Sequence, residues 1–175
     1  MQTLYGQDLK TALFNRVDFA MKHYEEFGVP HWDVINEMVD QGAENHTFFL
    51  DHTGDPELRE KVFKHAKVLS PDTIYFVNDC GIILNKYGRF ELYQEQIWEL
   101  LAAGAQIDAI GLQSHIHGED LVDVKYHVDQ LWDEFQLPIL VTEFDWNAGN
   151  AVDIEDTQFM QNKFKPFIGS CLVTK

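Results

Sequence analysis

Apolar and polar positions follow two alternating periods along the chain, one typical of helices and one typical of buried strands. Apolar side chains recur at helical spacing over Asp8–Phe27, and Gly28 and Pro30 end that pattern. The same spacing predicts further helices over residues 55–69, 89–103, 120–135 and 153–164. The polar stretch Met38–Asp55 contains two glycines and predicts a long loop.

Short apolar runs between these helices predict parallel strands at His31–Glu37, Thr73–Asn78, Ile107–Gln113 and Ile139–Phe144. Strands that alternate with helices indicate the α/β class, and regular intervals between the strand ends favour a barrel repeat. A closed barrel needs eight strands and at least about 200 residues. We therefore expect a partial (β/α)8 TIM barrel in one domain over 1–175, barrel-like from about 8 to 161, with an atypical tail over 162–175.

Composition narrows the function classes. Apolar residues make up 45% of the 175 residues, which is typical of a domain with a hydrophobic core. The formal charge of −16 disfavours a nucleic-acid partner, and no apolar run approaches the roughly 18 residues that a membrane span needs. The N-terminus lacks the pattern of a signal peptide, so either the protein is intracellular or its true N-terminus is absent.

Two predicted strands end in a glutamate, Glu37 and Glu143. Active sites of α/β barrels lie at the carboxyl ends of the strands, so the two carboxyl groups can face each other there. Paired carboxyl groups cleave glycosidic bonds, and a separation of about 5–5.5 Å is typical of retaining enzymes. We expect Glu37 to act as general acid and Glu143 as nucleophile.

Residues two apart on a strand share a face, so Glu143 and Asp145 project together, as do Gln113, His115 and His117. The strands of Gln113 and Glu143 are consecutive, which favours a neighbouring position in the sheet. His115 can then bond to Glu143 through one nitrogen and to Asp145 through the other. Such contacts would keep Glu143 ionised and aimed.

Residues around these carboxylates suggest sugar contacts. Asp33 shares a face with Glu37, and Asn36 can bind a sugar hydroxyl near the reacting carbon. Trp146 can either stack on a sugar ring or pack in the fold, whereas Trp98 and Trp132 lie on predicted helices and are expected in the core.

Alternative interpretations remain open for these motifs. Glutamates at strand ends are often only solvated or paired at a barrel rim. The pair His115 and His117, with Glu143 nearby, could instead hold a metal ion, although that hypothesis leaves Asn36 unexplained. Cys80 is expected to be a free thiol.

Together these residues resemble glycoside hydrolase family 10, the endo-β-1,4-xylanases, from about Asp8 to Gln161. The segments that carry the resemblance are Trp32–Glu37, Asn78–Asp79, Gly111–His115 and Thr142–Asp145. The resemblance implies a (β/α)8 barrel of which this chain holds strands 4 to 7. It also implies cleavage of xylan, or of xylan and cellulose, with retention, no metal or other cofactor, and secretion of the full-length protein.

By the same resemblance, each site residue receives an expected role. Glu37 is the acid/base and Glu143 the nucleophile. The supporting residues are His115, Asp145 and Asp33, and the substrate-binding residues are Asn36, Gln113, Asn78 and Trp146.

The chain also departs from the family pattern. Strands 1 to 3 and a tryptophan-bearing strand 8 are not recognisable, and Cys80-Gly81 replaces the usual Tyr-Asn after Asn78-Asp79. A second hypothesis is therefore a truncated, non-catalytic carbohydrate-binding or vestigial product.

Overall fold

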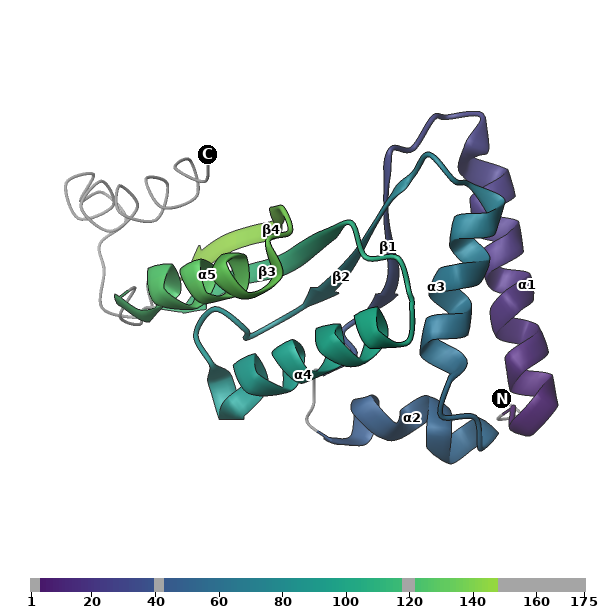
Figure 1. Ribbon diagram of the computed structural model, residues 1–175, viewed down its shortest axis with the longest axis horizontal. Helices are drawn as coiled ribbons and strands as arrows, with labels where there is room; N and C mark the ends of the chain where they lie inside the picture. The colour runs from purple at the N-terminus through teal and green to yellow at the C-terminus, as the bar shows by residue number, and fades with distance from the viewer. Residues whose placement is uncertain (1–3, 40–42, 118–121, 148–175) are drawn as a thin grey trace.

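Helices and strands alternate along the chain in the computed structural model, which describes residues 4–39, 43–117 and 122–147 (Figure 1). A short 3-10 turn, Lys86–Gly88, precedes the fourth helix. The elements, in chain order, are α1 (Gly6–Glu25), β1 (His31–Asn36), α2 (Ala43–Thr53), α3 (Leu58–Leu69), β2 (Ile74–Asp79), α4 (Arg89–Ala102), β3 (Ala109–His117), α5 (Val122–Phe135) and β4 (Ile139–Asn147).

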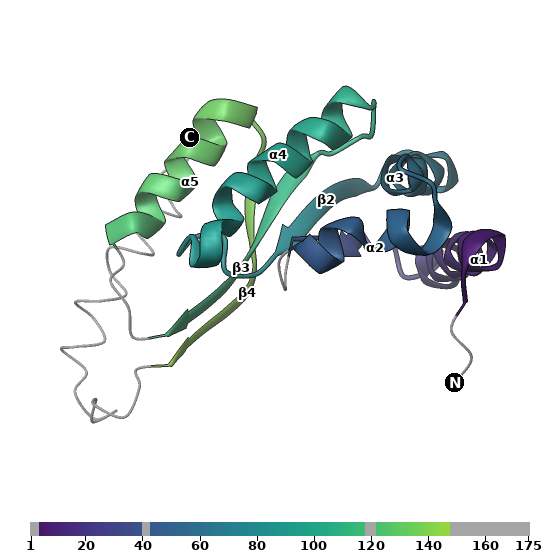
Figure 2. The ribbon, with the colours of Figure 1, turned by 90° about the horizontal axis from the view of Figure 1, so that it is seen from below.

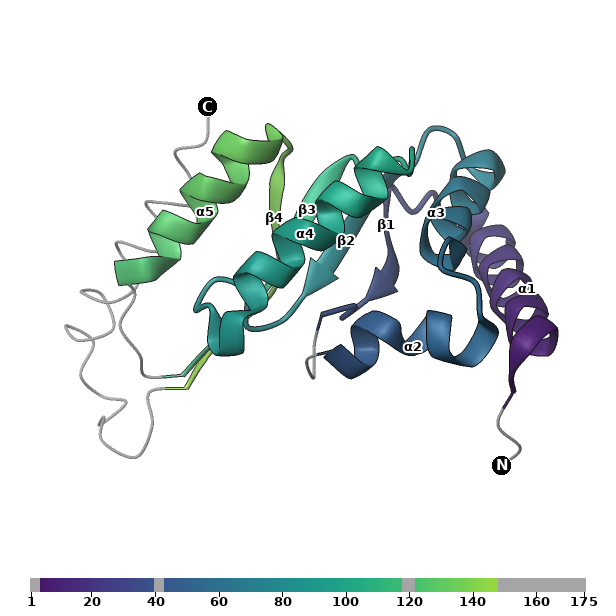
Figure 3. The same ribbon diagram turned by 60° about the horizontal axis from the view of Figure 1, so that its bottom comes forward.

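The four strands form one parallel sheet in the order β1-β2-β3-β4. Each strand pairs with the next one in the chain, as in a sheet wound by successive β/α units. Figure 2 shows α4 and α5 along one side of the strands, and Figure 3 shows α3, α4 and α5 following one another across the sheet. The fold thus confirms the predicted class, a parallel α/β sheet that forms part of a barrel.

The main hydrophobic core lies between the sheet and the helices that cover it. Tyr93 and Ile97 of α4 pack there against Ile110 and Leu112 of β3, and all four are fully buried. Burial of each such side chain contributes roughly 1.5–3 kcal/mol. This core fixes which face of each strand is turned away from the helices, and therefore which side chains face the barrel interior.

Alpha helix α2 lies where the sequence pattern predicts a loop. Three consecutive apolar residues, Phe48 to Leu50, hide the helical period, because such a run does not mark one face of a helix. Phe49 and Leu50 line a hollow of about 310 Å³ together with residues of α3 and α4, and the helix itself packs against α1 and α3. The helix predicted over 153–164 lies outside the described residues.

Trp98 was expected in the core, and that expectation is wrong. Its side chain is 51% exposed, because the neighbouring Ile97 occupies the buried face of α4. The indole Nε1 donates a hydrogen bond to Glu134 at 2.6 Å, and the ring lies 5.3 Å from that of Phe135. Trp98 of α4 therefore contacts α5 at the surface. Trp132, which was also expected in the core, is half-buried.

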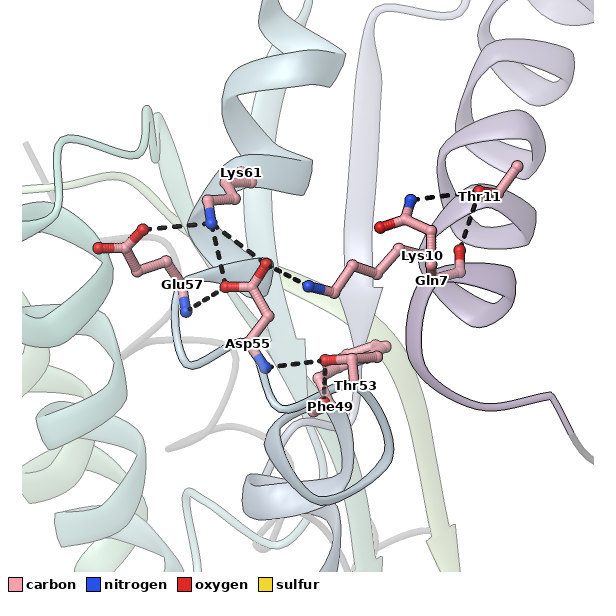
Figure 4. A network of polar contacts seen from close by, with 8 residues as sticks. All are labelled: Gln7, Lys10, Thr11, Phe49, Thr53, Asp55, Glu57 and Lys61. Atoms are coloured by element: carbon pink, nitrogen blue, oxygen red, sulfur yellow. Dashed lines mark hydrogen bonds and ion pairs between the residues drawn. The ribbon is translucent and has the colours of Figure 1, made fainter.

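A network centred on Asp55 joins α1, the end of α2 and the start of α3 (Figure 4). Lys10 Nζ lies 2.9 Å from Asp55 Oδ2, and Lys61 Nζ lies 3.0 Å from Oδ1. The backbone N–H of Glu57, the N-cap residue of α3, donates to Asp55 Oδ1 at 3.1 Å, so Asp55 caps the turn that leads into α3. Hydrogen bonds from Lys10 and Lys61 hold the pKa of Asp55 down at about 2.

We expect Asp55→Ala to lower the free energy of unfolding by about 1–2 kcal/mol at neutral pH, through the lost cap and ion pairs. The depressed pKa of about 2, against 3.8 for a free Asp, means that the carboxylate stabilises fully above pH 4. This contribution is lost as the pH falls from 4 towards 2. Urea unfolding of wild type and variant should therefore converge at low pH, whereas Asp133→Ala, at an exposed site on α5, should change little at any pH.

Candidate active site

The carboxyl ends of the four strands bring polar side chains from distant parts of the chain to one edge of the sheet. Asn36 of β1 is in register with Asn78 of β2, and Gln113 of β3 is in register with Glu143 of β4. The predicted strand period therefore gathers the expected residues at the edge where α/β barrels carry their active sites.

His115 joins the two carboxylates of β4, as the spacing of the residues predicts. Its Nδ1 lies 2.7 Å from Asp145 Oδ2, and its Nε2 lies 3.2 Å from Glu143 Oε2. The hydrogen bond to Asp145 and the negative charges of Asp145 and Glu143 raise the pKa of His115. With both ring nitrogens engaged, His115 fits a role that orients Glu143 better than a role as metal ligand.

Gln113 of β3 contacts Glu37, the residue that follows β1, and so links it to the middle of the sheet. Its Nε2 donates to Glu37 Oε1 at 2.9 Å and lies 3.3 Å from Asn36 Oδ1. Gln113 is also in register with Glu143, so the side chain that holds Glu37 starts from the strand next to Glu143. Gln113 is 3% exposed, so these contacts are sheltered from water.

The backbone of Glu37 adopts an unusual left-handed conformation with φ of +57°. A side chain there costs roughly 1–2 kcal/mol relative to the right-handed region, so neighbouring contacts must hold it. The N–H of Glu37 donates to the carbonyl of Asn78 at 2.9 Å. Two residues later, the N–H of Val39 donates to Asp79 Oδ2 at 2.7 Å. The segment that carries Glu37 is thus clamped against the end of β2.

Asp79 is the fully buried part of this clamp, and its Oδ1 also accepts a hydrogen bond from the N–H of Cys80 at 2.9 Å. We expect Asp79→Ala to lower the free energy of unfolding by about 3 kcal/mol, because buried N–H groups lose their acceptor. Urea unfolding measures this loss. Asp72→Ala, at an exposed carboxylate before the same strand, is the matched control. Equal stability of the two variants would contradict the clamp.

Asp33 of β1 lies close enough to these residues to interact with them. Burial raises the pKa of Asp33 to about 7, a contact with Asn78 lowers it, and the negative charges of Asp79, Glu37 and Glu143 raise it. Its buried Oδ1 has no hydrogen-bond partner among the described residues. Near neutral pH the carboxyl therefore carries a proton much of the time, which limits the negative charge around the two glutamates.

The side chains of two candidate residues are not described. The backbone of Trp146 belongs to β4 and that of His117 to β3. Within the described residues no cluster of His, Cys, Asp and Glu could hold a metal ion. Cys80 forms no disulfide in the part of the chain that the structure describes, and its Sγ accepts a hydrogen bond from Arg89 Nη1 at 3.2 Å. No described helix has the length and hydrophobicity needed to cross a membrane.

Sequence reasoning assigned no role to two residues that the geometry brings into the site. Asp79 faces the side of β2 opposite to Asn78, and the Asn-Asp pair at a strand end was the available signal. Thr142 Oγ1 donates to Asn78 Oδ1 at 2.7 Å, a contact between strands that are not neighbours in the sheet. No local pattern predicts that second contact.

A parallel β/α sheet that carries two glutamates at its carboxyl edge, one held by a His–Asp pair, has the architecture of the barrel glycoside hydrolases. The family model described as "Glycosyl hydrolase family 10" matches residues 1–175. The chain therefore belongs to glycoside hydrolase family 10.

Most of the curated relatives that the chain matches are named endo-1,4-beta-xylanases, and one is named an exoglucanase. The chain is 31% identical over 152 residues to endo-1,4-beta-xylanase A of Thermoanaerobacterium saccharolyticum, covering 85% of this chain and 13% of that protein. It is 33% identical over 163 residues to endo-1,4-beta-xylanase 1 of Arabidopsis thaliana, covering 91% of this chain and 16% of that protein.

A solved structure confirms the fold. The intracellular xylanase of T. saccharolyticum, in complex with xylotriose, matches with a TM-score of 0.84 at 22% identity. The match covers 97% of this chain and 54% of that chain. The chain thus spans about half of the solved domain and a small share of the curated relatives it matches.

Proposed function

We propose that this chain carries the acid/base and nucleophile part of a retaining endo-β-1,4-xylanase. Membership of glycoside hydrolase family 10 supports the substrate class. The observation that carries the proposal is the arrangement of Glu37, Gln113, Glu143 and His115 at one edge of the sheet. Two carboxyl groups at one edge of the sheet, each held by a polar side chain, are the equipment for cleaving a glycosidic bond by double displacement.

In the first step, the Glu143 carboxylate attacks the anomeric carbon and the bond to the leaving oxygen breaks. Glu37 gives its proton to that oxygen, and an ester joins the sugar to Glu143. In the second step, Glu37 takes a proton from water, whose oxygen attacks the anomeric carbon and releases Glu143. Two inversions at one carbon give net retention.

Neighbouring side chains support these two roles. Hydrogen bonds from His115 aim Glu143, and Asp145 on the opposite nitrogen holds the imidazole ring. Gln113 positions Glu37 through its amide. A protonated Asp33 avoids a further negative charge while Glu143 is ionised, which favours nucleophilic attack.

Two side-chain amides are proposed to contact the sugar. Asn36 and Gln113 lie beside Glu37, within reach of hydroxyl groups near the reacting carbon. Asn78 reaches the sugar through Asn36, to which it donates a hydrogen bond. Trp146 directly follows Asp145, and we propose from this position that it stacks on a sugar ring.

The stereochemistry of the product tests the proposal. The full-length protein is incubated with xylan, and proton NMR follows the anomeric signal of each new reducing end. The β-anomer should appear first and then mutarotate to the equilibrium mixture. Initial release of the α-anomer, or no release of reducing sugar, would overturn the proposed mechanism. Parallel incubation with cellulose determines whether the site also accepts glucose units.

We further propose that the full-length protein acts outside the cell, because a polysaccharide is too large to cross a membrane unaided. One structural relative is described as an intracellular xylanase, so family membership alone leaves both compartments open. Xylanase activity in the cell-free culture medium supports secretion, whereas activity confined to the cell lysate contradicts it.

A further inference from the structure

We propose that Thr142 is a positioning residue that fixes the side-chain amide of Asn36 through Asn78. In this arrangement Asn36 presents its NH2 group, and not its carbonyl oxygen, to the sugar. The inference rests on the proposed function, since it concerns how the same site binds its substrate. It assigns Thr142 a role that neither the strand pattern nor the two glutamates explain.

The relay begins with a hydrogen bond across the sheet. Thr142 Oγ1 of β4 donates to Asn78 Oδ1 of β2 at 2.7 Å, although β3 lies between the two strands. Because the carbonyl oxygen of Asn78 is engaged on that side, its NH2 group is turned towards β1. Asn78 is 5% exposed, so its amide cannot exchange these partners freely for water.

Two backbone features make this long contact possible. Leu112 is in register with Val141 and Gln113 with Glu143, so Thr142 is the extra residue of a bulge in β4. A bulge re-aims the side chain of the bulged strand.

A glycine opens the path between the two side chains. Gly111 of β3 lies beside Asn78, and a Cβ at Gly111 would meet Asn78 Oδ1 at 2.8 Å and the carbonyl oxygen of Val77 at 2.7 Å. Any side chain there would block the approach of Thr142 to Asn78. Bulge, glycine and hydrogen bond are three separate observations that agree.

The second half of the relay sets the amide of Asn36. Asn78 Nδ2 donates to Asn36 Oδ1 at 3.1 Å, and Gln113 Nε2 donates to the same oxygen at 3.3 Å. An amide oxygen has two lone pairs, so Asn36 Oδ1 is fully used. The group of Asn36 that remains for the sugar is its NH2, a hydrogen-bond donor.

In the amide of Gln113 the NH2 group is the part that is already bonded, and the carbonyl oxygen is the part that remains. Its Nε2 is shared between Asn36 and Glu37, which leaves its carbonyl oxygen as an acceptor. The sugar therefore meets one donor and one acceptor side by side. This pairing matches a hydroxyl group, which both accepts and donates a hydrogen bond. Flipping the amide of Asn36 would present two acceptors and weaken that match.

The test compares Thr142→Val, which removes the hydroxyl at nearly constant shape, with Thr142→Ser, which keeps it. We expect Thr142→Val to lower kcat/KM for an aryl β-xylobioside about tenfold, mainly through kcat. Thr142→Ser should restore nearly wild-type kinetics. Thr73→Val is the matched control, because it removes a hydroxyl bonded to Ser70 at the opposite edge of the sheet. The control should leave the kinetics unchanged.

A double-mutant cycle identifies the path of the effect. In an Asn36→Ala background, Thr142→Val should cost little more, because the amide that it orients is already gone. The hydroxyl on C2 is the one next to the reacting carbon, and it is the expected partner of the Asn36 amide. Hydrolysis of an aryl glycoside without this 2-hydroxyl should likewise be insensitive to Thr142→Val. Equal losses with and without Asn36, or wild-type kinetics of Thr142→Val, would overturn the relay.

A readout without turnover separates this inference from the proposed function. In 15N-labelled protein, the NH2 protons of Asn78 should exchange slowly with water in wild type and Thr142→Ser, and faster in Thr142→Val. If the wild-type protein hydrolyses nothing, the proposed function fails and this exchange rate alone decides the relay. An unchanged rate in Thr142→Val would contradict it.

Discussion

Glu143→Gln is expected to lower xylan hydrolysis at least about 10⁴-fold, the scale expected when the nucleophile of a covalent mechanism is lost. Glutamine keeps the shape of the side chain and a hydrogen-bond acceptor for His115, but its neutral amide cannot form the ester. Release of reducing sugar from xylan measures the loss. Binding of xylo-oligosaccharides, followed by calorimetry, should persist, because the sugar contacts proposed for Asn36 and Gln113 do not involve the Glu143 carboxylate.

The matched control for this variant is Glu95→Gln, at an exposed glutamate on α4. It makes the same chemical change on the helix side of the sheet and should leave hydrolysis unchanged. Wild-type activity in Glu143→Gln would contradict the proposed nucleophile. A wild-type protein that binds xylo-oligosaccharides without cleaving them would favour the non-catalytic hypothesis instead.

Glu37→Gln is expected to slow hydrolysis of xylan by about 10²–10⁴-fold, the usual contribution of a general acid. The loss should depend on the leaving group. A sugar alkoxide is a poor leaving group, so the glycosidic oxygen needs a proton from the general acid before it leaves. A dinitrophenolate leaves without protonation. The first step with a dinitrophenyl β-xylobioside should therefore remain fast, and a burst of phenolate should precede slow release of the sugar from Glu143.

Stopped-flow absorbance compares the two substrates directly. Glu95→Gln again serves as the control, with no burst beyond that of wild type. Equal losses on both substrates would contradict the acid role of Glu37 and point to a purely structural effect at its strained backbone position.

Sequence reasoning could predict the parts of this protein that depend on local periods. Alternation of helices and apolar strands is sufficient to predict the parallel sheet, since each strand simply pairs with the next. The spacing of two between Glu143 and Asp145 places both side chains on one face. Together with the consecutive strand of His115, it correctly predicts the two contacts of the imidazole ring.

Other features depend on contacts between strands that no single segment encodes. The bulge at Thr142 appears only when β4 is aligned against β3, so the strand period alone cannot reveal it. Asp79 accepts a hydrogen bond from the backbone N–H of Val39 on the loop after β1, and that loop has no hydrophobic period. The raised pKa of Asp33 arises from burial and from charges on three other segments. Helix α2 was missed because its apolar residues are contiguous.

The left-handed backbone at position 37 makes the glutamate proposed for catalysis less favourable for folding than a glycine at the same position. Glycine adopts such a conformation without steric cost, so a glycine there would relieve roughly 1–2 kcal/mol that the glutamate imposes. Under the proposed function, selection for hydrolysis opposes that drift, and so does the loss of the hydrogen bond from Gln113 to Glu37. Descendants freed from degrading polysaccharide should accumulate glycine or asparagine at this position early, so the residue found at position 37 in each lineage records whether catalysis was still under selection.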